Sequence, residues 1–329
     1  MCWRHGCALL FLVAISISPV QARLWPIDPE APILLGVGDR VDWFTHSVRR
    51  ATWSSARALE QPTDLITIWL PRGWRASWIP KRRLKQLTEV GTIPVILHYY
   101  FEDRISQQAI ERNRNGWHQS LRHMGEQLKD IHPVLIVLEP EFNDEPPPGE
   151  THTMQWPNLA SELSMAIDIV REQAPHAMIS VGAGDFSPTR NLEHVIWPII
   201  HKLDFLAFQE MRADTDPDYR SVDYFNVGDA AVEYAAYLKQ FGLPILLAYV
   251  ALSSHGNWEN KQKTMLQQLR NKNDQLKQNG VFGVSYFQLF DDPQHQGYFK
   301  AAEKHFGLYT HDGTAKPAAE VFKQWGLEP

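Results

Sequence analysis

Eight short apolar segments recur along the chain, separated by polar stretches and by segments of helical period. They are ILLGVGD (33–39), DLITIWLP (64–71), IPVILHYYF (93–101), PVLIVLEPE (133–141), AMISVGAGD (177–185), LDFLAFQEM (203–211), PILLAYVAL (244–252) and VFGVSYFQLF (281–290). Each is apolar on both faces, as expected for parallel strands that helices cover. Helical periodicity follows at 80–90, 159–173 and 261–278, among other places. Eight alternating units predict an α/β fold, a closed (β/α)8 TIM barrel in a single domain.

An open, doubly wound sheet is the alternative arrangement of such units. The first apolar segment is not followed by a dinucleotide-binding loop, because GVGDRVDWF lacks the third glycine of that fingerprint. Connections from helix into strand are short, whereas those from strand into helix are long and polar, as at 141–157 and 212–228. In a (β/α)8 barrel the strand-to-helix loops form the active site, so this asymmetry favours the barrel.

The N-terminal residues have the pattern of a targeting segment. Residues 1–22, MCWRHGCALLFLVAISISPVQA, have the pattern of a secretory signal peptide cleaved after Ala22. An uncleaved membrane anchor is the alternative, but the apolar run is shorter than the roughly 20 residues that span a bilayer. Both cysteines, Cys2 and Cys7, lie in this segment, so the mature chain of residues 23–329 contains none. We expect a secreted or periplasmic protein without disulfides or stable membrane insertion.

Charge bears on the class of partner. The formal net charge is −6 and no long basic run is present. Nucleic-acid binding depends on neutralising phosphates with lysine and arginine, so no nucleic-acid partner is expected. We expect a monomer.

The fourth apolar segment ends in acidic residues, Glu139 and Glu141, at the end of its predicted strand. A buried carboxylate without a partner is costly, so a purely structural Glu139 would need a partner such as an arginine. The alternative places Glu139 at the open end of the barrel as a catalytic group. Residues two apart on a strand point the same way, so both acids could face one site.

Polar residues also end the other predicted strands, and we predict that they bind substrate at one end of the barrel. Each one alone is more often a residue that caps a loop; their common location is what indicates a site. The predicted substrate-binding residues are Asp39, His98, Tyr100, Glu141, Asn143, Asp185, Gln209, Tyr249, Gln288 and Asp291. Five tryptophans near predicted loops either stack on sugars or pack in the ordinary way: Trp43, Trp74, Trp117, Trp156 and Trp258.

The C-terminal segment HFGLYTHDGTAKPAAEVFKQW (305–325) resembles the closing segment of (β/α)8 glycoside hydrolases of the clan that includes cellulases, xylanases and β-glucanases. Strand four of that clan typically ends in Asn-Glu-Pro, with the glutamate as acid/base, and LEP matches this at Glu139 and Pro140. The resemblance implies a glycoside hydrolase in which Glu139 is the acid/base. Two carboxyl groups suit this reaction, because one protonates the leaving oxygen while the other attacks the sugar or activates water.

The sequence departs from that pattern in two places. Leu138 replaces the asparagine, and the seventh segment lacks the glutamate that serves as nucleophile in the clan. By position, Glu210 after the sixth segment is the predicted second catalytic carboxylate, with Asp291 or Asp292 behind it. Glu141 is its main competitor.

Metal and cofactor signatures are weak. The histidines form no HExxH or His-x-His pattern, and the acidic run at 214–225 lacks the glycine and the final glutamate of a calcium loop. We therefore expect no metal and no cofactor. The sequence predicts an exported glycoside hydrolase that acts on a poly- or oligosaccharide; the alternative is a noncatalytic carbohydrate-binding barrel that lacks the second carboxylate.

Overall fold

The structure is a computed structural model that describes residues 31–39, 59, 63–102, 105–143, 158–184, 192–216 and 222–327. The predicted signal peptide, Trp43, Trp156 and Asp185 lie outside the described residues, and so does the side chain of Asp39. Within the described part, no helix is long and apolar enough to cross a membrane.

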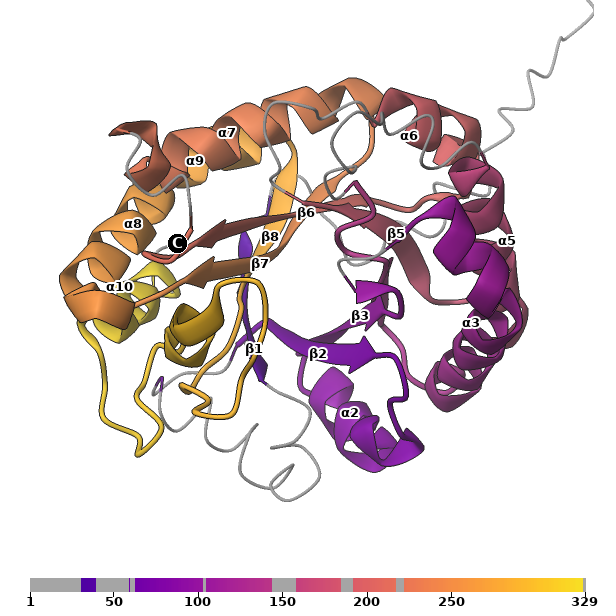
Figure 1. Cartoon of the computed structure of the whole chain (residues 1–329), viewed down its shortest axis with the longest axis horizontal. Helices are drawn as coiled ribbons and strands as arrows, with labels where there is room; N and C mark the ends of the chain where they lie inside the picture. Colours follow the sequence, from indigo (N-terminus) through magenta and orange to yellow (C-terminus); the bar gives the residue numbers. More distant parts are fainter. Residues whose placement is uncertain are drawn as a thin grey trace, which may run out of the picture.

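Eight parallel strands form a closed barrel in sequence order, which confirms the predicted (β/α)8 fold (Figure 1). Each strand overlaps one of the eight apolar segments identified in the sequence. The strands are β1 (Leu34–Asp39), β2 (Leu65–Pro71), β3 (Ile93–Tyr99), β4 (Leu135–Leu138), β5 (Met178–Ala183), β6 (Leu206–Arg212), β7 (Ile245–Leu252) and β8 (Val281–Tyr286). Because β8 pairs with β1, the sheet has no free edge.

Helices surround the strands, as Figure 1 shows. The α-helices are α2 (Lys81–Glu89), α3 (Gln107–Leu128), α5 (Leu159–Gln173), α6 (Glu193–Ile199), α7 (Val227–Leu238), α8 (Glu259–Asn271), α9 (Asn273–Gln278) and α10 (Pro317–Trp325). The short 3-10 helices are η2 (Ala76–Trp78), η4 (Ile200–Lys202), η5 (Val222–Phe225), η6 (Lys239–Phe241), η7 (His255–Asn257) and η8 (Lys300–His305). The single helix expected at 261–278 is two helices, α8 and α9, which meet at Lys272.

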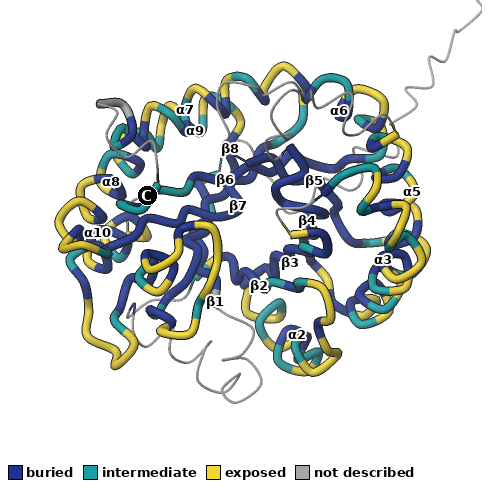
Figure 2. Tube along the Cα trace, in the orientation of Figure 1, coloured by how far each residue is buried: buried dark blue, intermediate teal, exposed yellow. Residues whose placement is uncertain are grey.

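Alternate residues of each strand face two separate cores. One set, which includes Leu65, Val95 and Val137, fills the inside of the barrel. The other set, which includes Ile68, Ile96 and Ile136, packs against the helices. Figure 2 shows the strands buried and the helices exposed on their outer sides. The two cores give a way of deciding where a side chain points, because residues paired in register on neighbouring strands share a face.

The inside of the barrel is narrow beside β1. A Cβ on Gly38 would lie 2.1 Å from the carbonyl oxygen of Phe287, so no side chain fits at this position. Two polar side chains inside the barrel pair with each other: Thr67 Oγ1 and Ser285 Oγ lie 2.7 Å apart. The barrel is therefore a packed core, and a site can form only above it, at an end.

Candidate active site

Glu141 lies over the carboxyl end of the barrel. Its Oε2 accepts a hydrogen bond of 2.5 Å from the Tyr99 hydroxyl, and its Oε1 accepts one from the Tyr249 hydroxyl. Tyr99 ends β3 and Tyr249 lies on β7, and these strands are on opposite sides of an eight-stranded barrel closed in sequence order. A carboxylate that contacts both therefore lies across the opening. Two O–H donors stabilise negative charge on Glu141.

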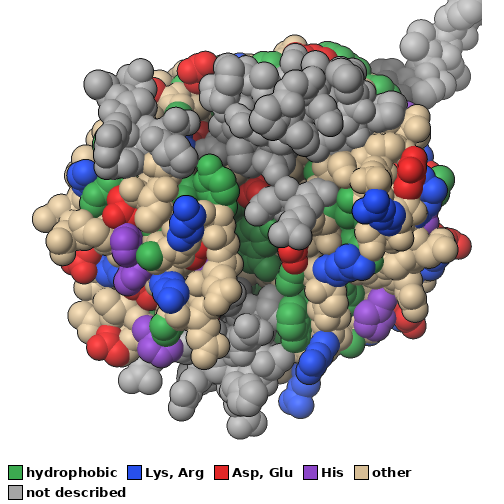
Figure 3. Space-filling model, in the orientation of Figure 1, with side chains coloured by type: hydrophobic (Ala, Val, Ile, Leu, Met, Phe, Trp, Pro, Cys, Tyr) green, Lys and Arg blue, Asp and Glu red, His purple; other side chains and the backbone are tan. Residues whose placement is uncertain are grey.

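The two tyrosines that hold this carboxylate belong to a cluster of aromatic rings. The Trp69 ring centroid lies 5.7 Å from that of Tyr99, 4.8 Å from that of Tyr249 and 5.4 Å from that of Phe287, all in edge-on arrangements. We call Trp69, Tyr99, Glu141, Tyr249 and Phe287 the mouth cluster. The Trp69 indole Nε1 is buried and has no hydrogen-bond partner within the described part of the chain. On the face in Figure 3, hydrophobic and acidic side chains border a central hollow.

Glu139 follows the last residue of β4 and has a positive φ of 45°, a conformation that is strained for a glutamate. Its backbone N–H donates to the carbonyl oxygen of His98 at 2.9 Å. The next residue, Pro140, packs so closely on β5 that a Cβ on Gly182 would lie 2.4 Å from its Cα. The strand alternation is thus broken at Glu139, so a period of two residues does not decide whether the Glu139 and Glu141 carboxyl groups face one site.

The Glu139 carboxylate lies at the end of β3 and is 1% exposed. Its Oε2 accepts the backbone N–H of Phe101 at 3.1 Å, and its Oε1 is 3.6 Å from His98 Nδ1. Among the described residues no arginine or lysine pairs with it, so the partner that a structural glutamate would need is a histidine here. Both acids contact the end of β3 and the residues that follow it: Glu139 contacts His98 and Phe101, and Glu141 contacts Tyr99 between them.

Glu210 is placed differently from the prediction. It pairs in register with Val250, which belongs to the outer core, and its neighbour Gln209 pairs with Tyr249 of the mouth cluster. Glu210 therefore points away from the barrel axis, and its Oε2 lies 2.8 Å from the Arg212 guanidinium on the same strand face. The expectation that Glu210 supplies the second catalytic carboxylate is corrected by this geometry, because its side chain forms a buried ion pair outside the barrel.

His98 and Tyr100 also face outward, toward α3. His98 Nε2 lies 2.9 Å from Ser120 Oγ on α3. The Tyr100 ring is stacked on His98 with centroids 6.1 Å apart, and the Arg72 guanidinium lies over that ring at 5.4 Å. A Cβ on Gly116 would meet the Tyr100 hydroxyl at 2.5 Å, so this tyrosine is packed against the helix. Tyr100 is therefore not placed to contact a substrate at the mouth cluster.

Asn143 holds two loops together. Its Oδ1 accepts the backbone N–H of Gly184 at 2.6 Å, and its Nδ2 donates to the carbonyl oxygen of Gly184 at 3.3 Å. The side chain thus pairs with the backbone just after β5 as a neighbouring strand would. Asn143 is 1% exposed, and this role replaces the predicted contact with substrate.

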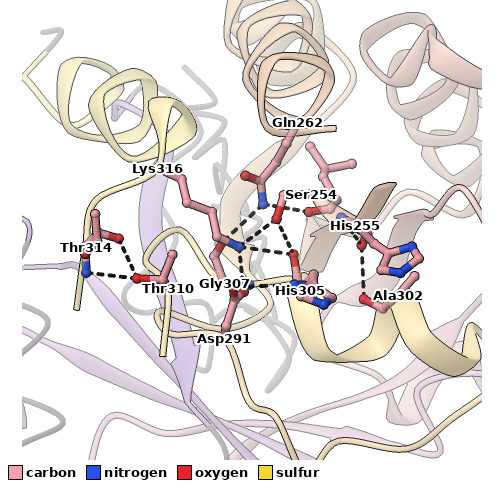
Figure 4. Close-up of polar contacts among 12 residues, drawn as sticks. Ser254, His255, Gln262, Asp291, Ala302, His305, Gly307, Thr310, Thr314 and Lys316 are labelled. Carbon is pink, nitrogen blue, oxygen red and sulfur yellow. Dashed lines mark hydrogen bonds and ion pairs between the residues drawn. The ribbon is translucent and has the colours of Figure 1, made fainter. Parts of the chain in front are cut away.

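Asp291 belongs to a buried network at the C-terminal segment (Figure 4). Its Oδ1 lies 2.6 Å from Lys316 Nζ and accepts the backbone N–H of Gly307 at 2.9 Å. Lys316 Nζ also donates to Ser254 Oγ at 2.8 Å. Burial lowers the pKa of Lys316 and raises the pKa of Asp291, while the ion pair opposes both shifts. The predicted substrate contact of Asp291 is thus corrected to an ion pair that fixes the chain before α10.

Two predicted amides are buried beside the barrel's interior. Gln209 lies on the inner face of β6, in register with Tyr249. Gln288 follows Phe287 after β8 and is 1% exposed, and neither its amide oxygen nor its amide nitrogen has a hydrogen-bond partner among the residues that the structure describes. An unsatisfied buried amide is costly, so Gln288 is a candidate to hydrogen-bond a polar ligand.

The sequence reasoning missed Trp69 and Phe287 and did not commit to Tyr99. Trp69 could have been found by period two, because Leu65 and Thr67 on the same strand also face inward. Of the tryptophans expected to stack or pack, Trp117 is fully buried in α3, Trp258 packs edge-on against Phe225, and Trp74 donates from Nε1 to Ser120 Oγ at 2.8 Å. In each of the three, packing or hydrogen bonding is what the structure shows.

No family model matches the chain, and no curated protein matches it in sequence. Several solved structures share its fold. A GH5_18 protein from Bifidobacterium longum subsp. longum, in complex with Manβ1-4GlcNAc, aligns with a TM-score of 0.61 and 12% identity over 90% of this chain and 78% of that one. An exo-β-1,4-mannosidase from Opitutaceae bacterium strain TAV5 aligns with a TM-score of 0.61 and 15% identity over 90% of this chain and 59% of that one. Xylanase B from Clostridium stercorarium F9 aligns with a TM-score of 0.57 and 15% identity over 88% of this chain and 96% of that one. At these identities the likeness is one of fold.

Proposed function

We propose that the protein is a glycoside hydrolase that cleaves O-glycosidic bonds of a poly- or oligosaccharide, with Glu139 and Glu141 as its two catalytic carboxyl groups. The observation that carries the proposal is the placement of Glu141, a carboxylate held at the barrel opening by the hydroxyls of two tyrosines that belong to a cluster of aromatic rings. The fold neighbours support it, because their names include a mannosidase, a xylanase and a complex with a mannose-containing disaccharide.

The two carboxyl groups have different surroundings, and glycosidases need them to differ. Hydroxyl donors from Tyr99 and Tyr249 stabilise Glu141 as an anion. Glu141 is therefore assigned to attack the sugar or to activate a water. Glu139 lacks such a pair of hydroxyls and has His98 beside it, so Glu139 is assigned to protonate the leaving oxygen, as its match to the Glu-Pro of the clan implies.

The mouth cluster suits a sugar. Aromatic faces and edges contact the C–H surfaces of pyranose rings, and buried donors are satisfied by hydroxyl groups. Trp69 Nε1 and the Gln288 amide are buried groups that lack hydrogen-bond partners in the described ranges of the chain. We assign both to substrate hydroxyls. Substrate binding then gives these buried groups the hydrogen bonds that they lack in the free protein, which offsets the free-energy cost of burying them unsatisfied.

The proposal also includes export of the protein from the cytoplasm. Residues 1–22 are assigned to a cleaved signal peptide, and the mature enzyme is proposed to act as a monomer outside the cytoplasm. Mass spectrometry of protein recovered from the exported fraction tests this: a mature N-terminus at Arg23 is expected, and an intact Met1 in that fraction would contradict cleavage.

The proposed activity is tested with aryl β-mannosides, β-xylosides and β-glucuronides and with the matching oligosaccharides. Turnover by the parent protein is expected, with Glu139→Gln and Glu141→Gln each reducing kcat by at least about a hundredfold, the usual contribution of a positioned acid or base. Glu172→Gln is the matched control, because Glu172 is exposed on α5. Full activity in both variants would exclude this pair, and sugar binding without turnover by the parent would indicate the noncatalytic barrel instead.

A further inference from the structure

A chain of buried and half-buried polar side chains runs from the loop after β2 to Glu139. Trp74 Nε1 donates to Ser120 Oγ at 2.8 Å, Ser120 Oγ lies 2.9 Å from His98 Nε2, and His98 Nδ1 lies 3.6 Å from Glu139 Oε1. The four residues come from four separate segments of the chain: the loop after β2, β3, α3 and the end of β4. His98 is fully buried, and Trp74 is 8% exposed. We call this chain of contacts the relay.

The hydrogen-bonding capacity of each member fixes the direction of the relay. An indole N–H is only a donor, so Ser120 Oγ accepts from Trp74. The hydroxyl keeps one proton to give, and His98 Nε2 is its other contact among the described residues. If His98 instead carried its proton on Nε2, Ser120 Oγ would accept two N–H groups, and its own proton would have no acceptor among the described residues. The satisfied arrangement is Trp74 to Ser120 to His98 Nε2.

This arrangement determines which ring nitrogen of a neutral His98 carries the proton. With Nε2 accepting from Ser120, the proton is on Nδ1, the nitrogen that faces Glu139 Oε1. The other tautomer would turn a lone pair toward a carboxylate oxygen, which is repulsive in a buried site. The distance of 3.6 Å is longer than a hydrogen bond, so in this structure the N–H acts on Glu139 as an oriented dipole.

Packing holds the relay in place. The Trp74 ring is stacked on His123 of α3 with centroids 4.9 Å apart and an interplanar angle of 22°. Tyr100 covers the face of His98. Neither Trp74 nor Ser120 touches the mouth cluster or the Glu139 carboxylate through any hydrogen bond that the structure shows, so their influence on Glu139 passes through His98.

We propose that Trp74 and Ser120 hold His98 in the tautomer with its proton on Nδ1, facing Glu139, and thereby act as positioning residues for that carboxyl group. The proposal deepens the proposed function, since it rests on Glu139 as the acid/base. When Glu139 gives its proton to the leaving oxygen, a carboxylate appears beside His98 Nδ1–H, and the fixed dipole stabilises it without reorganisation.

The tautomer is measured directly by long-range proton–nitrogen correlation NMR on the full chain with labelled histidine. His98 signals are assigned by their loss in His98→Gln. In the parent protein we expect a protonated Nδ1 and an imine-type Nε2. In Trp74→Phe the Ser120 hydroxyl is free to accept from Nε2–H, so signals of the second tautomer should appear. Trp78→Phe, in the same loop and outside the relay, is the matched control.

Activity gives the second measurement. Trp74→Phe and Ser120→Ala are expected to lower kcat about tenfold with little change in KM, the effect of weakening one hydrogen bond in the transition state. Ser120→Thr keeps the hydroxyl and should retain the parent kcat. An Nε2-protonated His98 in the parent, or a Trp74→Phe spectrum identical to the parent's, would overturn the proposal. The spectra do not depend on turnover, so an Nδ1-protonated His98 in a protein without glycosidase activity would count against the proposed function and leave the relay intact.

Discussion

Lys316 Nζ lies 2.6 Å from Asp291 Oδ1, and both side chains are more than nine-tenths buried. The pair joins the chain after β8 to the segment that begins α10 at Pro317. Removing one charge from a buried pair leaves the other uncompensated, which costs more than losing both.

Lys316→Met is therefore expected to lower the free energy of unfolding by about 3–5 kcal/mol. The double variant Lys316→Met with Asp291→Asn should recover part of that loss, because it leaves no buried charge unpaired. Urea unfolding followed by circular dichroism measures both. A double variant less stable than Lys316→Met would show that the pair does not carry the effect.

The two tyrosines that hold Glu141 give the next prediction. Tyr99→Phe and Tyr249→Phe each remove one hydroxyl donor from a carboxylate while keeping the ring, a change of about 1.5–3 kcal/mol for a hydrogen bond to a charged group. We expect kcat/KM to fall about tenfold to a hundredfold in each. Tyr298→Phe is the control, since Tyr298 is 64% exposed. If both variants keep parent kinetics, the hydroxyls do not support catalysis.

Trp69→Phe tests the unpartnered indole. The variant keeps an aromatic ring in the mouth cluster and loses the buried Nε1–H that we assign to a sugar hydroxyl. We expect substrate affinity to weaken about threefold to tenfold, with the melting temperature unchanged or raised, because no hydrogen bond within the protein is lost. Trp197→Phe on the outer surface, 48% exposed, is the matched variant. An unchanged affinity would show that the Trp69 Nε1–H does not bind the substrate.

We expect the stability of the fold to decrease at acid pH because the pKa values of three histidines are lowered. Burial lowers the pKa of His118, His132 and His305 below the ordinary value of 6.5. The unfolded chain therefore takes up protons at a higher pH than the folded protein, so stability is full above 6.5 and falls as the pH drops below it. Melting temperatures measured between about pH 5 and pH 7 should decline toward acid, with a shallower slope in His118→Gln.

His311→Gln serves as the comparison for that series, because His311 is exposed. It should leave the slope as in the parent. A slope in His118→Gln as steep as that of the parent would assign the acid sensitivity to other groups.

The barrel itself could be predicted from the sequence because its eight strands are apolar on both faces and its helices are amphipathic. These are local patterns, and each strand formed where its segment lay. The start of α10 at Pro317 is a local signal of the same kind, since proline is favoured in the first helical turn.

The direction of individual side chains could not be predicted as well. Glu210 and Gln209 are neighbours, and only the register of β6 against β7 shows that Gln209 faces the barrel axis while Glu210 faces the helices. A shift of one residue exchanges the two faces, and a short apolar segment does not specify which is which. The ion pair of Asp291 could not be predicted for another reason. Its partner Lys316 is 25 residues away in the chain, and no local sequence pattern indicates the pair.

The close contact between Pro140 and Gly182 ties both proposed catalytic acids to one rigid turn of backbone. The spacing of Glu139 and Glu141 is therefore set by the backbone of this turn and not by the long strand-to-helix connections. A redesign of sugar specificity should therefore leave the turn after β4 unchanged.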